Sequence, residues 1–80
     1  MQKNKKMNKK VLEAINEVVQ GKGDEAINSI NESTHLRDDL GFDSFDLAEL
    51  TVRIEEKTGV DIFENGVIET IGEIYEQINR

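Results

Sequence analysis

Residues 43–59 hold the sequence feature that most limits the fold, because both ends of one helix are encoded there. Asp43 is a favoured N-cap residue, and Gly59 is of the residue type that most often ends helices. Apolar residues recur at helical spacing between them, and the chain has no proline to prevent a helix. The sequence therefore predicts a helix over residues 44–58, with Asp46 in its first turn, where a carboxylate can accept backbone N–H groups.

Two further segments carry the same periodicity. The first covers residues 8–20 and stops at Gly21, as a glycine C-cap would stop it. The last opens at residues 70–73 with Thr-Ile-Gly-Glu, which matches the Ser/Thr-x-x-Glu capping box. We expect the apolar stripe of each helix to face the core, which predicts an all-α protein. The stripes consist of Val11, Leu12, Ile15, Val18 and Val19 in the first segment, and of Ile71, Ile74 and Ile78, flanked by Tyr75, in the last.

The connections between these helices are of unequal length. Residues 21–36 are polar and form a long stretch for a loop without structure of its own, so we expect a short helical piece around residues 24–30. Residues 63–69 have room for at most about one and a half helical turns, which predicts a short helix before the last one. The connecting residues expected to touch the core are Ala26, Ile27, Ile30, Leu36 and Leu40.

Length and composition limit what holds the fold together. A chain of 80 residues makes one domain with one small hydrophobic core. The absence of cysteine excludes a disulfide framework and a cysteine metal site. Residues 1–10 contain five lysines and no acid, and we expect residues 1–7 to be a disordered, lysine-rich head. The single domain is then expected over residues 8–79.

The net charge of -7 restricts the classes of partner. An acidic surface repels nucleic acid and anionic membranes, and it favours partner proteins with basic patches. No signal-peptide pattern follows the lysine-rich head, and no apolar segment approaches membrane-spanning length. We therefore expect a monomer that is cytoplasmic or confined to an organelle matrix. We expect it to bind basic protein surfaces and neither to bind nucleic acid nor to insert into membranes.

The predicted helix over residues 44–58 has more apolar surface than a small core can bury. Its core stripe is Leu47, Leu50, Thr51 and Ile54. A second apolar stripe, formed by Phe45, Ala48 and Val52, lies about 145° away on the helical wheel. It lies within an acidic rim and beside Ser44, which suits a docking surface for partner proteins. Phe45 has the alternative of folding back against the loop near Phe42. The candidate partner-binding residues are Phe45, Asp46, Ala48, Glu49, Val52, Glu55 and Glu56.

A resemblance to a known family lies in residues 40–50, which read Leu-Gly-Phe-Asp-Ser-Phe-Asp-Leu-Ala-Glu-Leu. This stretch resembles the attachment motif of acyl carrier proteins, in which Asp-Ser-Leu opens the second helix and the serine carries 4'-phosphopantetheine. Phe45 stands here in place of the usual leucine. The resemblance covers about residues 8–79. It implies a small four-helix bundle with a long loop between the first two helices and a short third helix.

The resemblance implies that Ser44 is the covalent attachment point of 4'-phosphopantetheine, whose thiol holds acyl groups as thioesters and passes them among enzymes. The implied partners are a phosphopantetheinyl transferase and acyl-transferring and acyl-modifying enzymes, first of all those of fatty acid biosynthesis. Asp43 belongs to the same motif. A helix N-terminus suits the phosphate, whereas Asp43 and Asp46 repel it, so we expect the transferase to supply Mg²⁺ during attachment.

Two alternatives remain open. Phe45 and the shortened segment between residues 62 and 70 also resemble specialised carriers, such as D-alanyl carrier proteins, which load an amino acid, or carriers of secondary-metabolite pathways. A carrier-like domain without modification would instead be a structural or regulatory subunit.

The residues give no pattern for catalysis or for a metal site. His35 is the only histidine, and the G-x-S-x-G elbow of a hydrolase is absent. The acids from Asp39 onward fail the EF-hand spacing, which would require glycine where Ser44 stands. We therefore predict a carrier rather than an enzyme, with no metal site of its own.

Overall fold

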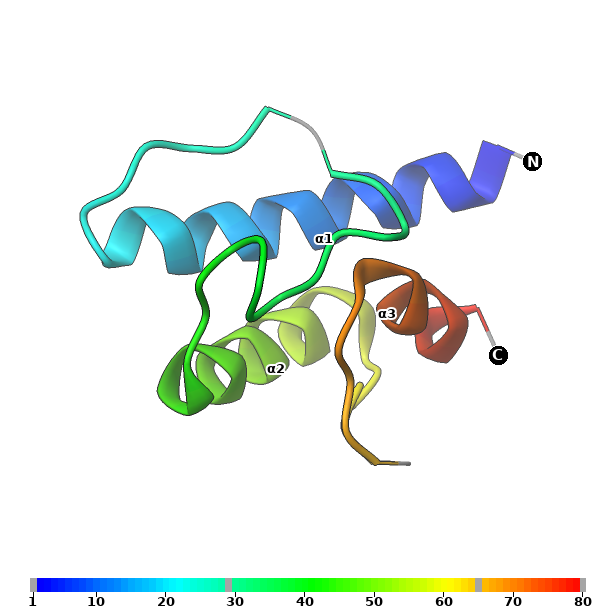
Figure 1. The fold of residues 1–80 in the computed structure, drawn as a ribbon. Helices are drawn as coiled ribbons and strands as arrows, with labels where there is room; N and C mark the ends of the chain where they lie inside the picture. The colour runs from blue at the N-terminus through cyan, green and yellow to red at the C-terminus, as the bar shows by residue number, and fades with distance from the viewer. Residues whose placement is uncertain (1, 29, 65, 80) are drawn as a thin grey trace.

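The computed structural model describes residues 2–28, 30–64 and 66–79, with side chains from residue 9 onward. Its helices are α1 (Gln2–Gly21), α2 (Ser44–Thr58) and α3 (Ile71–Ile78). α1 and α2 lie side by side, and α3 packs at one end of the pair (Figure 1). Within the described ranges no strand forms beyond an isolated bridge between His35 and Thr70, so the predicted all-α class is confirmed.

The central helix α2 has the bounds that the sequence predicts. Asp43 is its N-cap in extended backbone, with φ -96° and ψ -175°. Gly59 ends it in the left-handed region at φ 78°, and its N–H donates to the Glu55 carbonyl oxygen at 2.8 Å. Both caps were predicted because these residue types satisfy the free backbone groups at helix ends.

The first helix begins earlier than predicted, at Gln2 rather than at residue 8. Lysine, glutamine and methionine are good helix formers, and neither glycine nor proline precedes Gly21, so nothing local stops the helix. The start of α1 does not test two other predictions, which stay predictions. They are the disorder of residues 1–7 and the domain limits at residues 8 and 79.

The long connection after α1 does not form the helical piece expected around residues 24–30. Residues 24–28 and 30 are irregular, and residue 29 lies outside the described ranges. The Asn16 side chain holds this segment instead, because its Oδ1 accepts the Ile27 N–H at 2.6 Å and its Nδ2 donates to the Ile27 carbonyl at 3.0 Å. Ile27 and Ile30 pack against the core as predicted, but the prediction for Ala26 is wrong, since it is exposed.

The predicted short helix within residues 63–69 is also replaced by a turn. The Asp61 carboxylate accepts the Phe63 N–H at 3.0 Å, and the Asp61 carbonyl accepts the Glu64 N–H at 3.2 Å. Gly66 follows with φ 130°, outside the helical region. Residue 65 lies outside the described ranges. The described chain therefore has three helices, and the predicted four-helix bundle is not confirmed.

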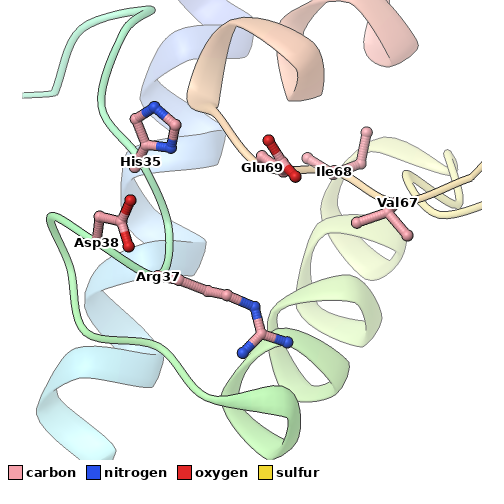
Figure 2. A pocket seen from close by; sticks show the side chains of 6 residues that line it. All are labelled: His35, Arg37, Asp38, Val67, Ile68 and Glu69. Carbon is pink, nitrogen blue, oxygen red and sulfur yellow. The ribbon is translucent and has the colours of Figure 1, made fainter.

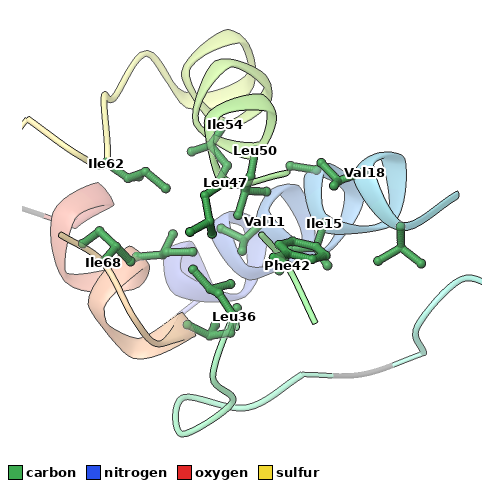
Figure 3. Packing of buried hydrophobic residues seen from close by; sticks show 14 residues of the cluster. Val11, Ile15, Val18, Leu36, Phe42, Leu47, Leu50, Ile54, Ile62 and Ile68 are labelled. Carbon is green, nitrogen blue, oxygen red and sulfur yellow. The ribbon is translucent and has the colours of Figure 1, made fainter. Parts of the chain in front are cut away.

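The core lies where the three helices and the end of the long loop meet (Figure 3). Leu36 is fully buried and Leu40 half-buried, so the loop is fixed to the bundle as predicted. Every residue of the predicted core stripes is buried or half-buried. The buried hydrophobic residues are Val11, Ala14, Ile15, Val18, Val19, Leu36, Phe42, Leu47, Leu50, Ile54, Ile62, Ile68, Ile71 and Ile74.

Backbone hydrogen bonds tie the long loop to the start of α3. The N–H groups of Ile71 and Gly72 donate to the carbonyl oxygens of Thr34 and Glu32, at 3.0 and 2.9 Å. The Leu36 N–H donates to the Glu69 carbonyl at 2.9 Å. These bonds bring residues 32–36 against residues 69–72.

None of the described helices has the length and apolar character required to cross a membrane.

Candidate functional site

The site is built on the capping box that starts α2. Asp43 Oδ1 accepts the Asp46 N–H at 2.8 Å, and Asp46 Oδ2 accepts the Asp43 N–H at 3.1 Å. Ser44 and Phe45 stand between these two residues, and both are exposed. In the described chain the N–H groups of Ser44 and Phe45 have no acceptor, so this helix end presents free donors beside an exposed hydroxyl.

The loop before α2 is held in place from both sides. Gly41 makes the turn in the left-handed region at φ 73°, where a side chain would be strained. Phe42 is almost fully buried, and its N–H donates to the Leu36 carbonyl at 3.0 Å. Buried Phe42 therefore fixes the position from which Asp43 and Ser44 emerge.

Lys22, which directly follows α1, neutralises one carboxylate of the site. Its Nζ lies 2.9 Å from Asp46 Oδ2 and 3.2 Å from the Gly41 carbonyl oxygen, and it stands 5.5 Å from the centre of the Phe42 ring. The hydrogen bond from Lys22, followed by the one from the Asp43 N–H, holds the pKa of Asp46 below its usual value. The same contact raises the pKa of Lys22. The repulsion expected from Asp46 is therefore offset by a cation that sequence reasoning did not identify.

Arg37, from the long loop, is the second residue that the sequence did not reveal. Its Nη2 donates to Ser44 Oγ at 3.2 Å, and the side chain is exposed. Figure 2 shows the guanidinium extending from the loop toward the start of α2. A lone arginine seven residues before the serine gives no signal in the sequence, because only the path of the loop brings the two together.

The second apolar stripe of α2 faces away from the core as predicted. Phe45 is 77% exposed and Val52 55% exposed, and Ala48 is exposed as well. Phe42, not Phe45, fills the core, so Phe45 has not folded back against the loop. These positions leave an apolar strip directly beside Ser44.

The acidic rim of this strip is less uniform than predicted. Glu55 and Glu56 are exposed, but Glu49 is half-buried and pairs with Arg53 at 2.9 Å. Arg53 pairs in turn with Glu17 of α1 at 3.1 Å. Asp46, predicted as a partner contact, is only 5% exposed, because its carboxylate belongs to the helix cap and to the Lys22 ion pair. We therefore place Asp46 in the cap and not on the partner surface.

A cavity of about 220 Å³ lies between the loop and the segment before α3 (Figure 2). His35 lines this cavity and forms no hydrogen bond with Ser44 in the described chain, so the two do not make a nucleophile and base pair. Arg37 both lines the cavity and contacts Ser44. The lining residues are His35, Arg37, Asp38, Val67, Ile68 and Glu69.

This arrangement fits an anionic group joined to Ser44. The hydroxyl is exposed, the adjacent N–H donors are free, and a guanidinium stands at hydrogen-bond distance from Oγ. Helix N-termini and arginine are both favourable for phosphate. Among the described residues, no group of three or more His, Asp or Glu side chains converges in a way that would hold a metal ion.

Comparison with known proteins places the chain beside carrier domains. Residues 9–78 match the protein family described as "Phosphopantetheine attachment site". A curated protein named "Acyl carrier protein", from Saccharopolyspora erythraea, is 34% identical over 70 residues, which cover 85% of this chain and 74% of that protein. No solved structure gives a significant match.

Proposed function

The chain belongs to the acyl carrier protein family, in which a domain bears a phosphopantetheine attachment site, and on this premise we propose that Ser44 is the attachment residue. Members of this family are carriers and not enzymes. The observation that carries the proposal is the position of Ser44: an exposed hydroxyl that opens α2 beside free N–H donors and the Arg37 guanidinium.

The prosthetic group supplies chemistry that the chain lacks. When bound, 4'-phosphopantetheine provides a flexible arm with a terminal thiol that holds an acyl group as a thioester. The protein has no cysteine, and a thiol fixed to the domain would not reach the active sites of other enzymes. The contribution of the chain is to present Ser44 and to stabilise the phosphodiester at the helix end.

Asp43 has two roles in this proposal. It caps α2 through Asp46, and its exposed side chain is available to the Mg²⁺ that we expect the phosphopantetheinyl transferase to bring. The cap explains how Asp43 is held next to Ser44 before the transferase binds.

The exposed face of α2 is the surface that we propose for the transferase and for the acyl-handling enzymes. It combines the apolar strip of Phe45, Ala48 and Val52 with the carboxylates of Glu49, Glu55 and Glu56. Such a surface suits partners with basic patches, which are attracted by the charge and bury the apolar strip. A cytoplasmic, monomeric carrier without nucleic acid or membrane ligands stays a prediction from the sequence.

Fatty acid biosynthesis is the pathway that we propose first, since it is the commonest duty of this family. The second candidate is a specialised carrier of aminoacyl or secondary-metabolite groups. The turn that replaces a third helix before Ile68 favours the second candidate, because it leaves less covering structure for a long acyl chain. Loading the protein with short and long acyl groups and comparing amide chemical shifts separates the two. Large, chain-length-dependent shifts at Leu50, Ile54, Ile62 and Ile74 would favour fatty acids.

The attachment residue is tested by mass. We expect Ser44→Ala to abolish the mass gain after incubation with a broad-specificity phosphopantetheinyl transferase, and to leave the circular dichroism of the protein unchanged. Ser33→Ala is the matched control, because Ser33 is also an exposed serine but lies in the long loop. A mass gain in Ser44→Ala would contradict the proposal. No gain in the parent protein would favour the unmodified structural subunit.

A further inference from the structure

Arg37 differs from Lys22, Arg53 and Lys57, the cations that belong to α2 or contact its carboxylates, because its guanidinium forms no ion pair within the described ranges. Lys22, Arg53 and Lys57 each form ion pairs with carboxylates. Arg37 has no carboxylate within ion-pair distance in the described part of the chain, although Asp38 and Glu69 line the same cavity. Its hydrogen bond goes to the neutral hydroxyl of Ser44. An arginine held beside a neutral group is available for an anion placed there.

Modification of Ser44 would place an anion at this position. A phosphodiester on Oγ has its non-bridging oxygens two bonds from the atom that Arg37 Nη2 already contacts at 3.2 Å. The planar guanidinium suits bidentate contact with phosphate oxygens. Asp46 is neutralised by Lys22, so Asp43 is the neighbouring carboxylate whose repulsion remains. Arg37 has the charge and the reach to offset it.

The cavity beside Arg37 offers a place for the first part of a phosphopantetheine arm on Ser44. Arg37 donates a hydrogen bond to Ser44 and also lines the cavity. His35 and Asp38 line the cavity from the loop, and Val67, Ile68 and Glu69 line it from the segment before α3 (Figure 2). Its volume of about 220 Å³ is below the ~300–1,000 Å³ of ordinary ligand pockets. The lining mixes charged and apolar side chains, which suits the amide-bearing start of a pantetheine arm better than a long alkyl chain.

Resting on the proposed modification of Ser44, we propose that Arg37 binds the phosphodiester and turns the first part of the arm toward this cavity. Arg37 is thus a positioning residue, which holds the resting arm against residues 67–69. A partner enzyme that binds the phosphate would release the arm by competing with Arg37.

The test compares the unmodified and modified forms of four proteins: the parent, Arg37→Gln, Arg37→Lys and Lys9→Gln. Lys9→Gln is the matched control, because Lys9 is exposed and its neighbour Lys10 contacts the Lys57 carbonyl oxygen, near the end of α2 opposite Ser44. Intact mass first establishes that each protein is modified. The readouts are the ³¹P resonance of the phosphodiester, the amide shifts of Val67, Ile68 and Glu69, and the melting temperature.

We expect modification to shift the amides of residues 67–69 in the parent and in Lys9→Gln, and to leave them unshifted in Arg37→Gln. The ³¹P resonance of Arg37→Gln should differ from that of the other modified proteins. Modification should lower the melting temperature of Arg37→Gln more than that of the parent, because the variant lacks the cation that offsets repulsion between the phosphodiester and Asp43. The extra decrease should be only about 3 °C, since an exposed charge pair contributes little stability. Arg37→Lys should restore the melting temperature more fully than the ³¹P resonance, because lysine keeps the charge and loses the fork.

The outcomes separate this inference from the proposed function. Full modification of all four proteins with identical ³¹P resonances and identical amide shifts would overturn the role of Arg37 and leave Ser44 as the attachment residue. Equal effects of Arg37→Gln and Lys9→Gln would do the same, because they would reflect net charge alone. No mass gain in any of the proteins would overturn the proposed function and this inference together.

Discussion

The helices α2 and α3 begin with the same local device and use it differently. In α2 the capping box joins Asp43 and Asp46, and in α3 it joins Thr70 and Glu73. Each N-cap side chain accepts the N–H of the residue three positions on, at 2.8 Å in α2 and 3.3 Å in α3. In both helices the later carboxylate accepts the N-cap N–H at 3.1 Å. Local geometry alone does not distinguish the two ends.

The long loop makes the difference between them. At α3, the N–H groups of Ile71 and Gly72 donate to loop carbonyl oxygens, so the helix end is covered. At α2, the corresponding N–H groups, of Ser44 and Phe45, remain free within the described chain, and the cations Lys22 and Arg37 approach from elsewhere in the sequence. A capping box is therefore structural by default, and it becomes a candidate site where its remaining donors stay open.

The largest expected difference between the two ends is in stability. Asp46→Ala should lower the free energy of unfolding by about 2 kcal/mol, because it removes the acceptor of the Asp43 N–H in the capping box and the partner of Lys22. Glu73→Ala should cost about 1 kcal/mol, since Glu73 accepts only backbone N–H groups in the described chain. Thermal or urea unfolding of both variants measures this difference.

The excess at Asp46 is traced to Lys22 by a double-mutant cycle. In a Lys22→Gln background, Asp46→Ala should cost about as much as Glu73→Ala does in the parent. Equal costs of the two single substitutions in the parent would mean that the Lys22 ion pair contributes no net stability. The two helix ends would then differ only in the free N–H groups of Ser44 and Phe45.

The glycines of the two ends give the next largest effect. Gly41 adopts φ 73° with open space where a Cβ would lie, whereas a Cβ on Gly72 would lie 3.1 Å from the Glu32 carbonyl oxygen. Alanine at either position should cost about 1 kcal/mol, by strain at Gly41 and by crowding at Gly72. Asparagine should be tolerated better than alanine at Gly41 and worse at Gly72. Unfolding of the four variants measures this, and the same ranking at both positions would refute it.

Acid should weaken both caps. Hydrogen bonds from Lys22 and the Asp43 N–H lower the pKa of Asp46, and the N–H groups of Glu69 and Thr70 lower that of Glu73. Both pKa values are depressed in the folded state, so the ionised carboxylates stabilise the fold. This stabilisation is complete above the ordinary pKa values of 3.8 for Asp46 and 4.5 for Glu73, and it is lost as the pH falls through the lowered values. The stability advantage of the parent over Asp46→Asn and over Glu73→Gln should thus be constant near neutral pH and shrink below about pH 4. Melting at stepped pH values measures it, and an advantage that persists undiminished to about pH 2 would contradict the assignment.

The smallest effect on stability is expected on the exposed face of α2. Glu56→Lys should change the free energy of unfolding by less than about 0.5 kcal/mol, because Glu56 is exposed and forms no ion pair within the described ranges. Glu49→Lys should cost slightly more, since it replaces the partner of Arg53 with a like charge. Both should weaken binding of the transferase at low salt, measured by titration. Unchanged binding of Glu56→Lys would remove this face as the partner surface.

The sequence determined much of the fold, because the decisive signals are local. Asp43, Gly59 and Thr70 set helix ends through groups within four residues, and helical spacing identified the buried stripes of all three helices. The resemblance in residues 40–50 likewise identified the family and the candidate serine. Each of these features depends on side chains that are neighbours along one helix or turn.

Tertiary structure decided the rest. The segment expected to be helical around residues 24–30 is held instead by Asn16, which hydrogen-bonds the backbone of Ile27. The short helix expected within residues 63–69 is replaced by a turn, in which the Asp61 carboxylate accepts the Phe63 N–H. The surroundings of Ser44 depend on Lys22, which is 24 residues from Asp46, and on the path of the loop that carries Arg37. A hydrogen bond between residues far apart in the sequence produces no periodicity or spacing by which it could be predicted. These contacts form because the core holds the loop against the helices, which only the tertiary structure shows.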